Sequence, residues 1–130
     1  MHMKYPLFYP NIHKEDILKE INHTLSTRWI GEGPKVKVFE QKFGEFLGAQ
    51  YPIAVNSCTS SLHLAYLLAG AKKGTEVIAP VFTCSATIHA IMHTGATPVF
   101  ADIKDDFTID PKDVARKITK KTVAIVAVDY

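Results

Sequence analysis

The sequence predicts an α/β fold in which a mostly parallel sheet carries helices on both faces. First, short apolar runs alternate with helical patterns from residue 49 onward, and this alternation is typical of parallel sheets. Second, 130 residues are enough for one packed core and too few for two substantial domains. Third, 47% hydrophobic and 22% charged residues are ordinary proportions for a globular protein.

Two amphipathic helices are predicted in the first 48 residues. The first covers residues 13–27, where apolar side chains recur at helical spacing: Ile17, Leu18, Ile21 and Leu25. The second begins at Pro34, which favours a first helical turn, and ends at Gly48, which favours a helix C-terminus. We therefore expect a helical arm over residues 1–48 and an α/β domain over residues 49–130.

Strands and helices alternate in the remainder of the sequence. The strands are expected at residues 51–55, 76–80, 97–102 and 122–128. The helices between them are expected at residues 59–69, 83–95 and 110–118. Asp110 suits the N-cap of the last helix, and Pro111 suits its first position. In open parallel sheets the loops at the strand carboxyl ends build the functional site.

Composition excludes several classes of function. The formal net charge of +2, from 15 basic and 13 acidic residues, gives no single-sign surface for nucleic acid. No stretch resembles a signal peptide or a membrane span, so we expect a cytoplasmic protein with no membrane partner. His89 and His93 have the spacing of a metal-binding pair but no third ligand, and Cys58 and Cys84 lack CxxC spacing, so no metal site is expected.

The stretch AVNSCTSSLHLA, residues 54–65, predicts an anion site. An apolar run ends in short hydroxyl residues and continues as a helix, whose first N–H groups have no intrahelical acceptor. The N–H groups of residues 58–60 and the nearby hydroxyls suit a phosphate group, but the stretch lacks the GxxxxGK[ST] and GxGxxG patterns of nucleotide sites. The alternative is simple capping of the helix, with Asn56 or Ser57 at the N-cap.

Three segments, read in order, resemble the start of a known family: RWIGEGPKVKVFEQKFGEFLGA, then AVNSCTSSLHLAYLLAGAKKGTEVIAPVFTCSATIHAIMHTGATPVFADI, then FTIDPKDVARKITKKTVAIVAVDY. The family is that of the DegT/DnrJ/EryC1/StrS aminotransferases, which use pyridoxal 5'-phosphate (PLP) and act on keto sugars linked to nucleotides. The resemblance implies the N-terminal part of a fold-type I PLP-dependent transferase, with residues 49–130 as the first half of its large PLP-binding domain.

The resemblance also implies cofactor-binding residues. NSCTSSLHLA is similar to the family motif whose turn holds the cofactor phosphate, which makes Ser57, Cys58 and Thr59 candidates for phosphate binding. Cys58 stands where the family commonly has glycine, so a backbone with positive φ is disfavoured there. APVFTCSATIHAI is similar to a second motif, in which Cys84 occupies the position of an aromatic residue that stacks on the pyridine ring. The side chain of Phe82, two residues earlier, is expected to point away from this ring-stacking position.

No catalytic residue is expected within residues 1–130. In the family, the Schiff-base lysine and the carboxylate at the pyridine nitrogen correspond to positions beyond residue 130, so the sequence is expected to be truncated or a fragment. The implied partners are a nucleotide-sugar substrate, an amino donor such as glutamate, and a second copy in a homodimer. The alternatives are a PLP-dependent sugar dehydratase of the same family, with histidine replacing the lysine, and a non-catalytic truncated fragment.

Overall fold

The computed structural model describes residues 9–129, and these residues form two compact units that divide between Ala54 and Val55. The first unit contains two helices, α1 (Lys14–Thr27) and α2 (Pro34–Leu47). Pro34 opens α2, and Gly48 ends it with a positive φ of 67°, as predicted. Within the described residues, no helix has both the length and the apolar character to cross a membrane.

The apolar stripe of α1 lies on the surface of its unit. Ile17, Leu18, Ile21 and Leu25 are each between 45% and 59% exposed, and no residue of α1 is buried. α2 buries only Gly44, where an added Cβ would lie 2.7 Å from Pro52 Cγ. The two helices therefore form as their sequences predict, but they bury little apolar surface against each other.

The second unit contains a parallel sheet with the strand order β2-β1-β3. These strands are β1 (Glu76–Pro80), β2 (Thr97–Ala101) and β3 (Thr122–Ile125). β1 pairs with β2 in parallel from Glu76–Thr97 to Pro80–Ala101, and it pairs with β3 in parallel across an irregularity between Glu76 and Val77. The central strand β1 is buried from Val77 to Pro80, which explains why these four residues are all apolar.

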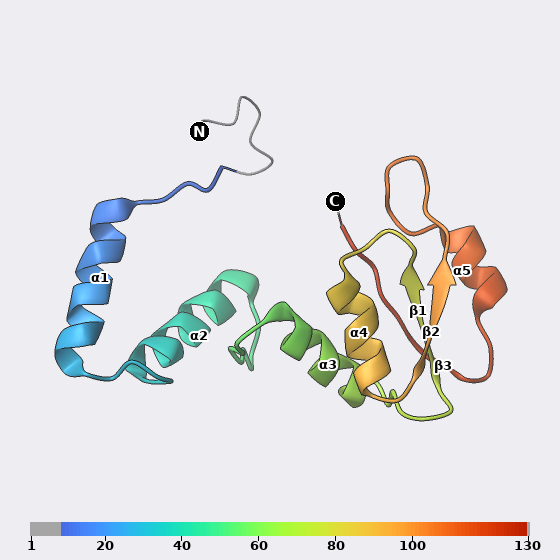
Figure 1. The fold of residues 1–130 in the computed structure, drawn as a ribbon, viewed down its shortest axis with the longest axis horizontal. Helices are drawn as coiled ribbons and strands as arrows, with labels where there is room; N and C mark the ends of the chain where they lie inside the picture. The colour runs from blue at the N-terminus through green and yellow to red at the C-terminus, as the bar shows by residue number, and fades with distance from the viewer. Residues whose placement is uncertain (1–8, 130) are drawn as a thin grey trace. The chain divides into compact units, whose positions relative to one another are not determined.

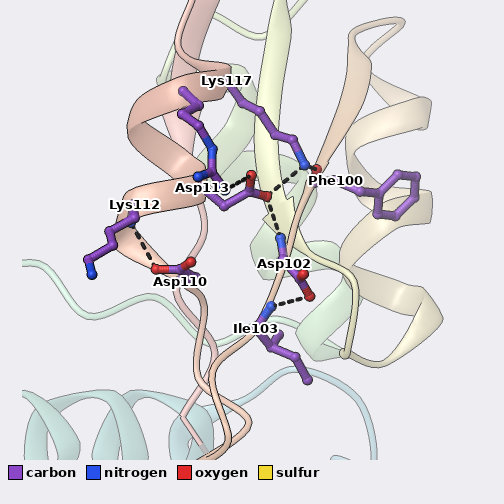
Figure 2. Close-up of polar contacts among 8 residues, drawn as sticks. Phe100, Asp102, Ile103, Asp110, Lys112, Asp113 and Lys117 are labelled. Carbon is purple, nitrogen blue, oxygen red and sulfur yellow. Dashed lines mark hydrogen bonds and ion pairs between the residues drawn. The ribbon is translucent and has the colours of Figure 1, made fainter.

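Helices cover both faces of this sheet, which confirms the predicted fold class. Figure 1 shows α4 (Ser85–His93) on one side of the strands and α5 (Pro111–Lys117) on the other. Successive β1 residues point to opposite faces, so Val77 joins the core with α4 and α3 (Cys58–Leu68) while Ile78 joins the core with α5. Asp110 caps α5 as predicted, because its side chain accepts a hydrogen bond of 2.9 Å from Lys112 N (Figure 2).

A buried carboxylate ties α5 to the end of β2. Asp113 Oδ2 accepts hydrogen bonds from Asp102 N at 2.7 Å and Lys117 Nζ at 2.6 Å, while its Oδ1 accepts one from Arg116 at 2.9 Å. Lys117 Nζ also donates to the Phe100 carbonyl at 2.7 Å, as Figure 2 shows. The hydrogen bond from Lys117, followed by those from Asp102 N and Arg116, holds the Asp113 pKa well below its usual value.

The predicted strand at residues 51–55 is wrong. The segment is not assigned to a strand, and Tyr51 and Ile53 are about four-fifths exposed. Ala54 N donates to Glu40 Oε1 at 2.9 Å, so α2 holds the segment with a side chain instead of a strand ladder. The last strand is also shorter than residues 122–128, although Val126 N still donates to the Ile78 carbonyl.

Candidate functional site

The turn before α3 combines capping with free backbone donors. Ser57 is the N-cap residue, and its Oγ accepts a hydrogen bond from Ser60 N at 3.2 Å. Ser60 Oγ in turn donates to Asn56 Oδ1 at 2.7 Å. The capping interpretation is therefore correct for Ser57, and Asn56 supports the cap through a second hydroxyl.

Capping leaves two N–H groups of the first turn without an acceptor. Among the described residues, no hydrogen bond is made by the N–H of Cys58 or Thr59, whereas the N–H of Ser60 and Ser61 bond to Ser57. Thr59 is half-buried and Cys58 is exposed. Both donors lie at the positive end of an 11-residue helix, so an anion can bind them without disturbing the cap.

Cys58, where the resemblance implies a family glycine, begins α3 without backbone strain. It is the first residue of α3, and the non-glycine residues with positive φ in residues 9–129 are Arg28 and Phe107. A right-handed helical conformation is open to any L-residue, so the loss of glycine costs nothing in backbone conformation. The cysteine instead gains helix stability relative to glycine.

Cys84 lies at the N-cap of α4, in the connection that leaves the carboxyl end of β1. Its φ and ψ are −61° and 141°, its side chain makes no capping hydrogen bond, and it is exposed. A hydrogen bond flanks this residue, because the hydroxyls of Thr83 and Thr87 lie 2.8 Å apart across the start of the helix. The thiol therefore projects from a defined turn.

Phe82 packs on a neighbouring loop. Its ring centroid lies 5.3 Å from that of Phe107, which has a φ of 65° in the loop after β2. This loop is closed by an isolated antiparallel bridge between Ile103 and Ile109, and in Figure 1 it extends beyond the arrowheads of β1 and β2. That Phe82 points away from the Cys84 position stays a prediction.

One of the paired histidines of α4, His93, makes an aromatic contact. His93 meets His63 of α3 edge to face, with ring centroids 5.9 Å apart. Over residues 9–129, no group of three or more His, Cys, Asp or Glu residues is arranged to hold a metal ion.

A buried tyrosine, which the sequence analysis did not single out, joins the two helices that carry the candidate residues. Tyr66 of α3 is 4% exposed, and its hydroxyl donates to the Thr87 carbonyl of α4 at 3.5 Å. Burial raises the Tyr66 pKa, with a further contribution from Cys58, so the hydroxyl stays protonated as a donor at neutral pH. The available signal was the single side-chain polar atom, the tyrosine hydroxyl, in the stretch LAYLL.

Comparison with known proteins assigns the family. The chain is 45% identical over 126 residues to the spore coat polysaccharide biosynthesis protein SpsC of Bacillus subtilis, covering 96% of this chain and 32% of that protein. It is 40% identical over 130 residues to GDP-perosamine synthase of Escherichia coli, covering 97% of this chain and 35% of the synthase. The chain therefore spans about a third of the length of the curated relatives it matches.

Solved structures agree with this assignment. A Streptococcus pneumoniae protein in its PLP form matches with a TM-score of 0.86 and 35% identity, over 93% of this chain and 31% of that chain. NtdA of Bacillus subtilis with bound cofactor PMP matches with a TM-score of 0.82 and 34% identity, over 87% of this chain and 26% of NtdA. The family itself matches residues 11–130. The chain belongs to the DegT/DnrJ/EryC1/StrS aminotransferase family.

Proposed function

We propose that this chain forms part of a cytoplasmic PLP-dependent aminotransferase that transfers an amino group, from a donor such as glutamate, to a nucleotide-linked keto sugar. The single observation that carries the proposal is the pair of free N–H groups at the start of α3, which lies within the residues that match the family. One relative is named GDP-perosamine synthase, and a product linked to a nucleotide supports a nucleotide-linked sugar as the substrate here. The solved structure of NtdA, with its bound cofactor PMP, supports PLP as the cofactor.

The residues of the turn fit the phosphate end of PLP. The N–H groups of Cys58 and Thr59 would donate to phosphate oxygens, and the Thr59 hydroxyl can add a third donor. Ser57 would act indirectly, because its hydroxyl already holds the cap through Ser60 N. The donor set consists of neutral groups at a helix N-terminus, which suits a dianion.

Cys84 would lie against the pyridine ring of the cofactor. A thiol is polarizable and can contact a ring face, but it covers less of that face than an aromatic side chain. When bound, PLP supplies an electron sink for the carbons whose bonds change during amino transfer. The described residues of this chain would bind and orient that group.

A second copy of the chain is the proposed partner. The exposed apolar stripe of α1, defined by Ile17, Leu18, Ile21 and Leu25, supports self-association because water-exposed apolar surface is stabilised by burial.

Alkylation of the two cysteines tests the cofactor site directly. The purified chain is treated with iodoacetamide, and the modification rates of Cys58 and Cys84 are measured separately by peptide mass spectrometry. Pyridoxamine 5'-phosphate is the probe, because it has no aldehyde to react with lysines or thiols. Pyridoxamine, which lacks the phosphate, is the matched control, and inorganic phosphate tests the turn alone.

The proposal expects a different pattern from each probe. Inorganic phosphate should slow modification of Cys58 only, whereas pyridoxamine 5'-phosphate should slow modification of both cysteines. Pyridoxamine should protect neither cysteine at the same concentration. If Cys58 reacts at the same rate with and without the two phosphate compounds, the turn is only a helix cap.

A further inference from the structure

The most deeply buried contact of α3 with the rest of its unit is made by Tyr66, while Leu62 packs at the edge of the same core and His63 meets His93. Tyr66 is the buried residue of this helix, at 4% exposure, and it packs in the core that includes Ala90 and Ile91 of α4. Long helical side chains point back toward the helix N-terminus, so the Tyr66 ring lies over the preceding turn of α3.

The Tyr66 hydroxyl reaches the first turns of α4. It donates to the Thr87 carbonyl at 3.5 Å, and Thr87 is itself buried, at 5% exposure. The Thr87 hydroxyl then pairs with the Thr83 hydroxyl at 2.8 Å, and Thr83 immediately precedes Cys84. Three side chains thus link α3 to the turn that presents Cys84.

We propose that Tyr66 is a positioning residue, which sets the turn that bears Cys84 relative to the phosphate-binding turn of α3 through its buried contact with Thr87. The inference rests on the proposed function, because the two turns would hold opposite ends of one cofactor. Neither turn needs Tyr66 for its own local hydrogen bonds, since Ser57 caps α3 and Thr83 pairs with Thr87. Tyr66 instead determines the distance between the turn before α3 and the turn that bears Cys84.

The variant Tyr66→Phe tests this assignment in the alkylation assay. It removes the hydroxyl and keeps the ring, so the core remains filled. Inorganic phosphate should protect Cys58 at an unchanged concentration. The concentration of pyridoxamine 5'-phosphate that half-protects Cys84 should rise about threefold, a value near the lower end expected for one lost neutral hydrogen bond. Thr87→Val, which breaks the link to Thr83, should raise the same concentration.

Controls separate positioning from folding and from the proposed function. Tyr51→Phe changes a tyrosine that is 80% exposed and should leave every protection curve unchanged. Thermal unfolding of each variant shows whether the fold persists. Unchanged protection of Cys84 in Tyr66→Phe overturns the assignment, and so does loss of phosphate protection at Cys58 in that variant. Absence of any protection in the unsubstituted chain overturns the proposed function and the assignment together.

Discussion

Replacing Ser57 by alanine should destabilise α3 while leaving its phosphate donors in place. The change removes the 3.2 Å hydrogen bond that Ser60 N makes to Ser57 Oγ. Loss of such a cap costs about 1 kcal/mol, which corresponds to a fall in Tm of roughly 4–8 °C for a domain of this size. The N–H groups of Cys58 and Thr59 have no part in the cap, so protection of Cys58 by phosphate should change little.

Replacing Thr59 by glutamate should have the opposite pattern of effects. A carboxylate in the first turn interacts favourably with the helix dipole and should stabilise α3 by about 0.3–1 kcal/mol. The same charge would lie about 5 Å from a bound phosphate dianion, where repulsion in a water-like dielectric is about 1.5 kcal/mol. Affinity for phosphate should therefore fall roughly tenfold. Thr59→Gln is the matched neutral control.

Two measurements on the same samples test this reasoning. Thermal unfolding followed by circular dichroism gives the stability of each variant, and the alkylation rate of Cys58 against phosphate concentration gives the affinity. We expect Ser57→Ala to lower Tm with affinity preserved, and Thr59→Glu to lower affinity with Tm preserved or raised. The reasoning is refuted if both variants lose affinity in proportion to lost stability, because the turn would then serve the helix alone.

Three further predictions concern the fold and the assembly. Ile78→Ala leaves a cavity at a fully buried site in the core beneath α5. The free energy of unfolding, measured with urea, should fall by roughly 2–5 kcal/mol. A cost below about 1 kcal/mol would contradict the packing described. Asp113→Asn should destabilise the protein at pH 7. Folding lowers the Asp113 pKa, so the ionised carboxylate stabilises the folded state fully at pH values above its unfolded pKa of about 3.9. This stabilisation is lost progressively as the pH falls below that value. The stability gap between the two proteins, measured by urea unfolding, should therefore narrow in acid, and a constant gap would show that the charge is not responsible. Ile21→Glu, in the exposed stripe of α1, should reduce self-association in light scattering at micromolar concentration, while Lys14→Glu should not. A monomeric unsubstituted chain would contradict the proposed partner.

The parts of the fold that the sequence predicts correctly are those whose signals are local. The sequence EVIAP predicts β1 with its observed bounds, and the four apolar residues that follow Glu76 are all buried. Asp110 and Pro111 marked the start of α5 because capping and a fixed proline φ depend only on neighbouring residues. The division of the chain at residue 48 stays a prediction.

The incorrect or missed predictions concern features that depend on residues distant in the sequence. The apolar residues at 51–55 have the composition of a strand, but a strand also needs a neighbour with which to form a ladder. Gly44 and Glu40 of α2 contact this segment instead, and no local pattern in residues 51–55 indicates such contacts. The Asp113 network was missed for a related reason, because one of its donors is the backbone of Asp102, eleven residues away.

The candidate site shows the same division between local and distant effects. Ser57 could be recognised as a cap from its neighbours, whereas the separation between its turn and Cys84 depends on how α3 packs against α4. That packing includes Tyr66, which contacts Thr87 across 21 residues of sequence. A motif therefore identifies groups able to bind each end of a cofactor, but it leaves open whether the two ends are held at the right distance. The expected departures from the family pattern concern the side chains of Cys58 and Cys84, while the backbone donors and the link between the helices depend on neither side chain. Binding should consequently be more sensitive to Tyr66→Phe than to Cys58→Ala, and a comparison of these two variants by isothermal titration with pyridoxamine 5'-phosphate checks that order.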